Sequence, residues 1–390
     1  MSDQPPRRIA LGFLLFAHLQ FGMATLLIAA SPADISGFFY HPKMIAVVHG
    51  LTLGWLSSCL IASEFIRLPR SRRWFDRLLL LCWVGGASGL PSHFWIQEYG
   101  GMGWSAGLIV LTVATLAFRF LAQASLSDDP PIVNAILSLA WINLLAIAIL
   151  GLLIGLNRTY PIVPGFSLHH AFGHAHLAAL GWVGMALLGI WLRGAAARPQ
   201  WASSILLGIG AAALQLGTTA ICIVLFVGEG SIKPYSWIAS GGLLLTIAAG
   251  LWIRRDALTK LSLAVRMLLL VGCGSFATAI GVGIRLSRLE AATERPDWIM
   301  LYGLLGLLGA LGSLIAAGVS HWLGRRGDLL ALGWLIGAPL VGYGLTTTSD
   351  SALRGGAIIL TIATAVSGLT AVATFKSRFD GYTRTQSADG

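Results

Sequence analysis

The chain has 390 residues, of which 56% are hydrophobic and only 11% are charged, and its mean hydropathy is +0.78. Soluble domains carry about 25% charged residues, so this chain has too few charges to cover a water-facing surface, and a soluble protein is excluded. The formal net charge of +10 suggests a nucleic-acid partner, but the basic residues lie in short segments between apolar runs rather than on one surface. Composition therefore predicts an all-α, multi-pass protein whose partner is the lipid bilayer, with no nucleic acid.

Apolar runs of about the 20 residues that cross a bilayer follow one another along the chain. They cover residues 8–30, 43–66, 77–96, 103–124, 132–156, 170–193, 201–227, 235–253, 262–284, 298–322, 328–346 and 354–375. We expect about twelve transmembrane helices in a single domain, 1–390, with a short N-terminal tail (1–8) and a C-terminal tail (376–390). Pro339 is the only proline that falls inside a run rather than near its end, so the eleventh helix should kink.

Lysine and arginine collect in the connections that follow the even-numbered runs, for example between residues 67 and 77 and at Arg325 and Arg326. The positive-inside rule places these connections, and with them both termini, in the cytoplasm. The acidic connection SLSDDPP after the fourth run fits this topology poorly. We expect a multi-pass protein of a bacterial inner (plasma) membrane.

Histidines are distributed unevenly, because seven of the nine fall in the outer half of this topology. Four of them lie at the start of the sixth run, in FSLHHAFGHAHLAALGW. On a helix His170 and His174 share one stripe, while His169 and His176 share another. Four imidazoles within eight residues of a membrane helix indicate metal or haem ligation, and two stripes favour two sites, or one site with a hydrogen-bonding network around it.

A short motif occurs twice, as His49-Gly-Leu-Thr-Leu-Gly-Trp55 in the second run and His176-Leu-Ala-Ala-Leu-Gly-Trp182 in the sixth. The shared pattern HxxxLGW lies at a similar depth in both predicted helices. A true internal echo would place His49 and His176 as equivalent ligands across a pocket, and two imidazoles from different helices are a common way to hold a low-spin haem. Coincidence is the competing explanation, because leucine, glycine and tryptophan are common in membranes.

Other histidines allow two interpretations. His93, in PSHFWIQE, is either a metal-ligating or proton-entry residue or an interfacial histidine of an aromatic belt. His18 is deep enough in the first run to be a ligand candidate, although a packed core histidine is the commoner case. His41 is interfacial, and His321 is an anchor at the cytoplasmic end of the tenth run.

The span count, the cytoplasmic termini, His49-Gly50 in the second run and the histidines of the sixth resemble subunit I of the haem-copper oxidase superfamily. The segments HPKMIAVVHGLTLGW and HAHLAALGWVGM carry the resemblance. It implies an oxidase-like bundle in which His49 binds haem and one of His170, His174 or His176 binds copper. The seventh to ninth runs contain no histidine, so a complete oxygen-reducing centre is not expected. In size and histidine placement the chain also resembles twelve-helix haem-and-copper proteins linked to nitric oxide tolerance.

These patterns lead to the hypothesis of a haem b protein, with copper as a second candidate cofactor, that handles electrons or a diatomic gas (O2 or NO) near the periplasmic face. His49 and His176 would be the axial ligands, and His170 with His174 a neighbouring metal site or hydrogen-bonding network. Such an oxidoreductase would take electrons from a quinol or a cytochrome. The rival hypotheses are a copper or zinc transporter that collects metal with the outer histidines, and an assembly or scaffold protein whose histidines merely pack.

Overall fold

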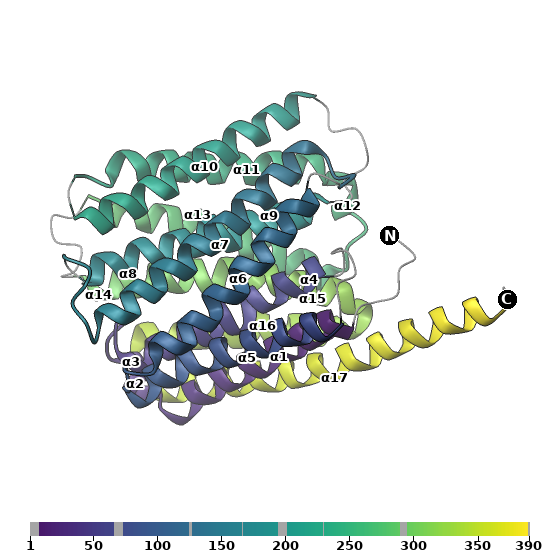
Figure 1. Cartoon of the computed structure of the whole chain (residues 1–390), viewed down its shortest axis with the longest axis horizontal. Coiled ribbons are helices and arrows are strands. Elements are labelled where there is room, and N and C mark those ends of the chain that lie inside the picture. The colour runs from purple at the N-terminus through teal and green to yellow at the C-terminus, as the bar shows by residue number, and fades with distance from the viewer. Residues whose placement is uncertain are drawn as a thin grey trace.

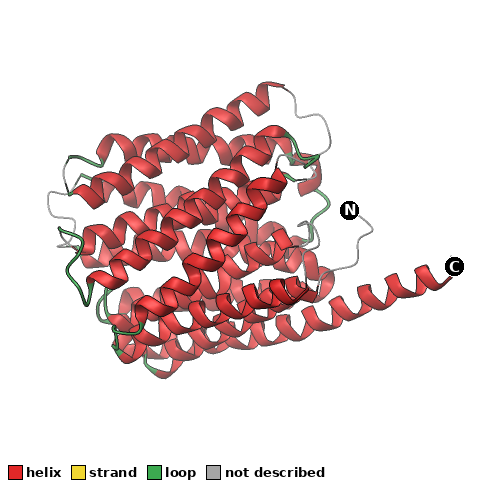
Figure 2. Cartoon of the chain, in the orientation of Figure 1, coloured by secondary structure: helices red, strands yellow, loops and turns green. Residues whose placement is uncertain are grey.

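The described part of the chain is helical throughout. The computed structural model describes residues 8–65, 73–124, 127–165, 167–193, 201–228, 230–288 and 295–388, and these residues contain no β-strand (Figure 2). The long helices run roughly side by side in one bundle (Figure 1). This arrangement confirms the prediction of an all-α polytopic protein.

The elements follow closely on the apolar runs of the sequence. In chain order they are α1 (Arg8–Ala30), α2 (Pro32–Ser36), α3 (Pro42–His49), η1 (Gly50–Ser57), α4 (Ser58–Phe65), α5 (Arg73–Ile96), α6 (Met102–Ala124), α7 (Pro131–Asn157), α8 (Ser167–His176), η2 (Leu177–Gly184), α9 (Met185–Leu192), α10 (Trp201–Val227), α11 (Lys233–Ile253), α12 (Arg255–Leu258), α13 (Leu263–Leu286), α14 (Pro296–Leu304), η4 (Leu305–Gly312), α15 (Ser313–Leu323), η5 (Gly324–Gly327), α16 (Asp328–Thr347) and α17 (Asp350–Ala388).

Eleven helical segments of the described chain are long and apolar enough to cross a membrane. The tenth, Pro296–Thr347, has 52 residues and would be about 78 Å long if straight. It is interrupted at Gly324, where φ is +65°, and α16 packs back against α14 and α15. The segment therefore supplies two spans, α14–η4–α15 and α16, in agreement with the expectation of about twelve spans.

Two details differ from the sequence prediction. Pro91 lies inside α5, five residues before the helix ends, so Pro339 in α16 is not the only proline within a span. In addition, α17 continues to Ala388 and projects beyond the bundle (Figure 1), whereas residues 376–390 were expected to form a tail. The part from Asp350 to Ser377 is long and apolar enough to cross a membrane.

The outside of the bundle is apolar, as a lipid-facing surface requires. Large hydrophobic side chains such as Trp104, Phe118 and Leu369 are more than 70% exposed. The second span, α3–η1–α4, is the exception, because 78% of its most apolar window is buried against 28–50% in the other segments. The second span is therefore an inner helix of the bundle, with little surface left for lipid.

Three similar units of four spans each make up the bundle. The units run from α1 to α6, from α7 to α11 and from α13 to α17. In each, the first span packs on the second and the third on the fourth, and the fourth packs on the first span of another unit: α6 on α7, α11 on α13, and α17 on α1. This pattern closes the units into a ring.

The middle of the second span in every unit is π-helical: η1, η2 and η4 have eight residues each. Such wide turns inside α-helices are rare and are frequent at functional sites. His49 immediately precedes η1, His176 precedes η2, and Leu304 precedes η4. The HxxxLGW echo is thus part of a threefold repetition whose third copy, Leu304 to Ala310, has lost both the histidine and the tryptophan.

The glycine of each motif provides a close contact with the first span of its unit. A Cβ added at Gly54 would lie 2.6 Å from Cβ of Gln20, and one at Gly181 would lie 2.9 Å from Nδ2 of Asn143. In the third copy, the corresponding contact of Gly309 is with Oγ of Ser275, at 2.6 Å. A polar side chain thus faces each motif glycine, and any larger residue there would have to displace it.

Candidate functional site

The second and sixth spans, which carry His49 and His176, are in direct contact. Nε1 of Trp182 donates to Oγ of Ser57 at 2.9 Å, across the two π-helical segments. Further along the same two spans, the guanidinium of Arg193 bonds both carboxylate oxygens of Glu64. The two helices predicted to share a cofactor are therefore neighbours.

His49 is held by its Nδ1, which leaves its Nε2 unprotonated. Its Nδ1 donates to the backbone carbonyl of Ile45 at 2.8 Å, and its ring stacks on Phe94 with centroids 5.2 Å apart. Because a carbonyl can only accept, the proton is on Nδ1 and the lone pair is on Nε2. None of the described residues forms a hydrogen bond with this Nε2.

His176 repeats this arrangement in the second unit. Its Nδ1 donates to the carbonyl of Phe172, also at 2.8 Å and also four residues earlier. Its Nε2 lone pair accepts a hydrogen bond from the hydroxyl of Tyr302, at 3.2 Å. The two imidazoles therefore share one tautomer and one relation to their helix, so that each presents Nε2 away from its own backbone.

His174, two residues before His176, lies near His49 and near α7. It is close enough to His49 for an electrostatic interaction, and an added Cβ at Gly151 of α7 would lie 3.1 Å from its Cε1. Its Nδ1 is buried and has no hydrogen-bond partner in the part of the chain that the structure describes. A buried polar atom without a partner is costly, and a ligand or an ordered water would satisfy it.

His170 contacts a different neighbouring helix from His174. His170 is buried, and its ring stacks on Phe226 of α10 with centroids 4.9 Å apart, whereas His174 faces α7. His169 is half-buried near the start of α8. The predicted pair of His170 and His174 thus contacts two different neighbouring helices, and a metal site shared by them stays a prediction.

His93 and His18 have partners of their own. Nδ1 of His93 lies 2.9 Å from Oε2 of Glu98, in the exposed turn after α5. The backbone N–H of Gly101, with the Gly100 N–H and His93 as further donors, holds the pKa of Glu98 below its ordinary value. Nδ1 of His18 bonds the Leu14 carbonyl within α1, and its Nε2 bonds Oγ of Ser367 on α17, so both of its nitrogens are occupied.

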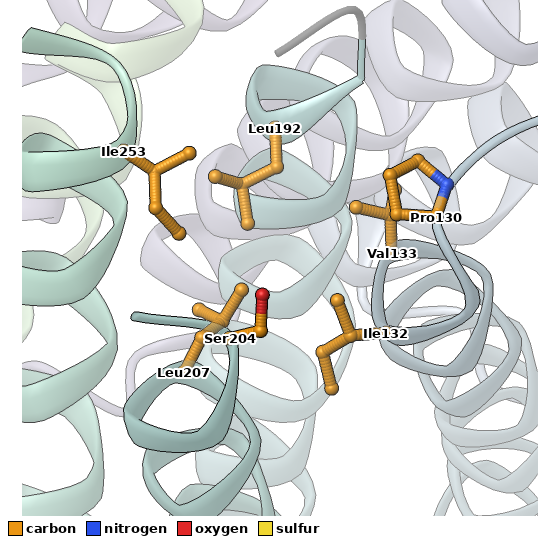
Figure 3. Close-up of a pocket in the computed structure, with 7 residues that line it drawn as sticks. All are labelled: Pro130, Ile132, Val133, Leu192, Ser204, Leu207 and Ile253. Carbon is orange, nitrogen blue, oxygen red and sulfur yellow. The ribbon is translucent and has the colours of Figure 1, made fainter. Parts of the chain in front are cut away.

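Among the described residues, no group of three or more His, Cys, Asp or Glu side chains is arranged to hold a metal ion. A hollow of about 280 Å³, including the space open at its mouth, lies away from these histidines beside the ends of α9 and α11 (Figure 3). Its lining is apolar except for Ser204. The hollow offers no chemistry comparable to that of the imidazoles.

Three features of this region were missed from the sequence. Tyr302 contacts His176 from the third unit. Arg158 sits among the rings of Tyr40, Phe94 and Tyr99, with its Cζ 5.2–5.4 Å from each centroid, and it interacts electrostatically with His49. No local pattern reveals either contact, because each joins residues more than fifty positions apart.

The third missed feature is an ion-pair network at the opposite end of the second and sixth spans. Arg193 lies 3.1 Å from Asp129 in addition to its bonds with Glu64, whose side chain is only 2% exposed. Asp129 belongs to the acidic connection that fitted the predicted topology poorly. Its pairing with Arg193 explains why a carboxylate occurs at this position, whichever side of the membrane the connection lies on.

Comparison of the chain with models of protein families, with curated proteins and with solved structures gives no match. The function therefore has to be argued from the chain's own residues.

Proposed function

We propose that this chain is a membrane protein that binds haem b through His49 and His176 and handles electrons or a diatomic gas such as O2 or NO. The observation that carries the proposal is the matched pair of imidazoles. Each directly precedes a π-helical segment, each donates from Nδ1 to the carbonyl four residues earlier, and the two lie on neighbouring spans.

The hydrogen bond at Nδ1 supports a ligand role. Metal-binding histidines commonly donate their other ring nitrogen to a carbonyl or carboxylate, which fixes the ring and raises its basicity. His49 and His176 both do so inside a helix, and the rings of Phe94 and Tyr302 stack on them. Flat aromatic and imidazole faces suit a flat macrocycle.

His174 supports a second role at the same site. Its unpartnered Nδ1 and its proximity to His49 make it the best candidate for a copper ligand, or for a hydrogen-bonding group beside the haem. A haem held in this way would supply one-electron and O2 or NO chemistry. The residues of the chain would hold and orient it, exclude water, and set its potential through the basicity of their imidazoles.

We place the site near the periplasmic face of a bacterial inner membrane, with both termini in the cytoplasm and a quinol or a cytochrome as the electron donor. The distribution of lysine and arginine and the resemblance to haem-copper oxidase subunit I support this placement. An oxidase-like bundle is in keeping with the three units of four spans.

The test is a pyridine haemochrome spectrum of the full-length protein, purified after expression with added iron. We expect haem b in the wild type, loss of most of it in His49→Ala and in His176→Ala, and no change in His321→Ala, a matched control at an exposed histidine. Absence of haem from the wild type would overturn the proposal. Metal-dependent uptake without a chromophore would instead indicate the transporter.

A further inference from the structure

Tyr302 joins the third unit to His176 of the second unit. It lies on α14, three residues before the start of η4, and its ring stacks on that of His176 with centroids 5.7 Å apart and planes at 28°. Its hydroxyl lies 3.2 Å from Nε2 of His176. The segments that follow the two residues, η2 and η4, also pack together, so this contact belongs to a helix interface.

The direction of this hydrogen bond follows from the rest of the imidazole. Nδ1 of His176 donates to the Phe172 carbonyl, so Nε2 carries no proton and can only accept. Tyr302 is therefore the donor, and its hydroxyl points into the lone pair with which an imidazole binds a metal. One lone pair cannot serve a hydroxyl proton and a metal ion at the same time.

We propose that Tyr302 acts as a gate on His176: the Tyr302 hydroxyl must leave Nε2 of His176 before that nitrogen can bind iron. The inference rests on the proposed function for the identity of the incoming group. His49 has no such donor among the described residues, so the two otherwise matched imidazoles differ in accessibility. Haem would then bind His49 first, and ligation by His176 would follow release of the Tyr302 hydroxyl.

The place of the tyrosine ring is built into the third unit. An added Cβ at Gly283 of α13 would lie 2.9 Å from Cε2 of Tyr302, so the glycine leaves the space that the ring occupies. The side chain is thereby held between α13 and His176. Release of the hydroxyl needs rotation of the phenol or movement of α14 as a whole.

The gate is tested without haem by carbethoxylation with diethyl pyrocarbonate: the unprotonated imidazole nitrogen attacks a carbonyl carbon of the reagent and takes up an ethoxycarbonyl group, with release of ethanol and CO2. Mass spectrometry of the full-length protein gives the labelling rate at His176. We expect Tyr302→Phe, which keeps the ring and loses the hydroxyl, to raise this rate about fivefold, as loss of one typical hydrogen bond allows. Tyr343→Phe, at a tyrosine that is 59% exposed on α16, should leave it unchanged.

Equal rates at His176 in the wild type and in Tyr302→Phe would overturn the gate. Tyr302→Leu provides a second variant without the hydroxyl, and continued protection of the buried His18 from labelling in both shows that the fold is intact. Titration with haemin then separates the two proposals. Faster labelling together with about fivefold tighter haemin binding supports both, whereas faster labelling with no haemin binding in any variant overturns the proposed function and leaves the gate standing.

Discussion

The carbonyl groups of Ile45 and Phe172 determine which ring nitrogen of His49 and His176 is free to bind a ligand. Each carbonyl fixes a proton on Nδ1, so that the unprotonated Nε2 points away from the histidine's own helix backbone. Neither bond requires a distant residue, since both connect a histidine to the residue four positions earlier in its helix. The identity of these ligand candidates was therefore accessible from the sequence. What faces Nε2 was not, since Tyr302 is 126 positions away from His176.

The glycine of the HxxxLGW motif gives a prediction at the same scale. Replacement of Gly54 by alanine puts a Cβ 2.6 Å from Cβ of Gln20, and this atom cannot move without shifting α1. We expect Gly54→Ala to destabilise the protein by about 1–3 kcal/mol, the usual cost of overpacking.

Gly22→Ala is the matched control, because a Cβ at Gly22 of α1 meets nothing within 4 Å. Unfolding of both variants in mixed micelles of increasing SDS fraction measures the difference. Equal stability of the two would show that α1 and η1 are not closely packed at the motif.

At the scale of elements, the second and sixth spans contact each other through polar side chains at two positions along their length: in the π-helical segments and at the ends of the spans. Hydropathy predicts where these spans begin and end, because burial and the bilayer select the same apolar residues. It does not predict that Trp182 meets Ser57 or that Arg193 meets Glu64, since the partners lie 125 and 129 positions apart. The π-helical turns also escape prediction, because they depend on packing around residues such as Gly54.

The ion pair leads to a prediction about the interface. Arg193→Gln removes the guanidinium that bonds both carboxylate oxygens of the nearly fully buried Glu64, and breaking a buried ion pair from one side costs about 3–5 kcal/mol. The double variant Glu64→Gln/Arg193→Gln removes both charges, so it should be closer to the wild type than Arg193→Gln is.

A double-mutant cycle in the same SDS unfolding assay measures the coupling between the two side chains. We expect a coupling of at least about 1 kcal/mol. Additive effects of the two single substitutions would mean that the two charges act independently and that the Glu64–Arg193 ion pair does not hold the spans together. The haem content of the variants then reports whether this ion pair also sets the distance between the two histidines.

At the scale of the whole molecule, three four-span units close a ring, and the second span of each contains a π-helical segment. Two copies of the motif were recognised from the sequence as an echo. The third escaped recognition because Leu304 and Ala310 stand where the others have histidine and tryptophan, and the remaining Leu-Gly pair is too common to identify a repeat. The contacts between spans, rather than residue identity, reveal the third copy.

This repetition predicts the effect of restoring the missing histidine. Leu304 precedes η4 as His49 precedes η1 and His176 precedes η2, and η4 packs against η2. Leu304→His should therefore place a third imidazole close to His176. Because imidazole ligands on adjacent helices act together on one ion, we expect Zn2+ to bind at least about tenfold more tightly than in the wild type, which corresponds to about 1.4 kcal/mol.

Isothermal titration of the purified variant with Zn2+ measures this gain. Leu305→His is the matched control, because it introduces the same side chain one residue further along, about 100° around the helix and away from the position that the repeat assigns. A gain in Leu304→His that disappears when His176→Ala is added would locate the new ion between the second and third units. Equal affinities in the Leu304→His and Leu305→His variants would mean that the residue before η4 is not oriented as His49 and His176 are before η1 and η2. The third unit would then repeat the fold of the other two without repeating their histidine site.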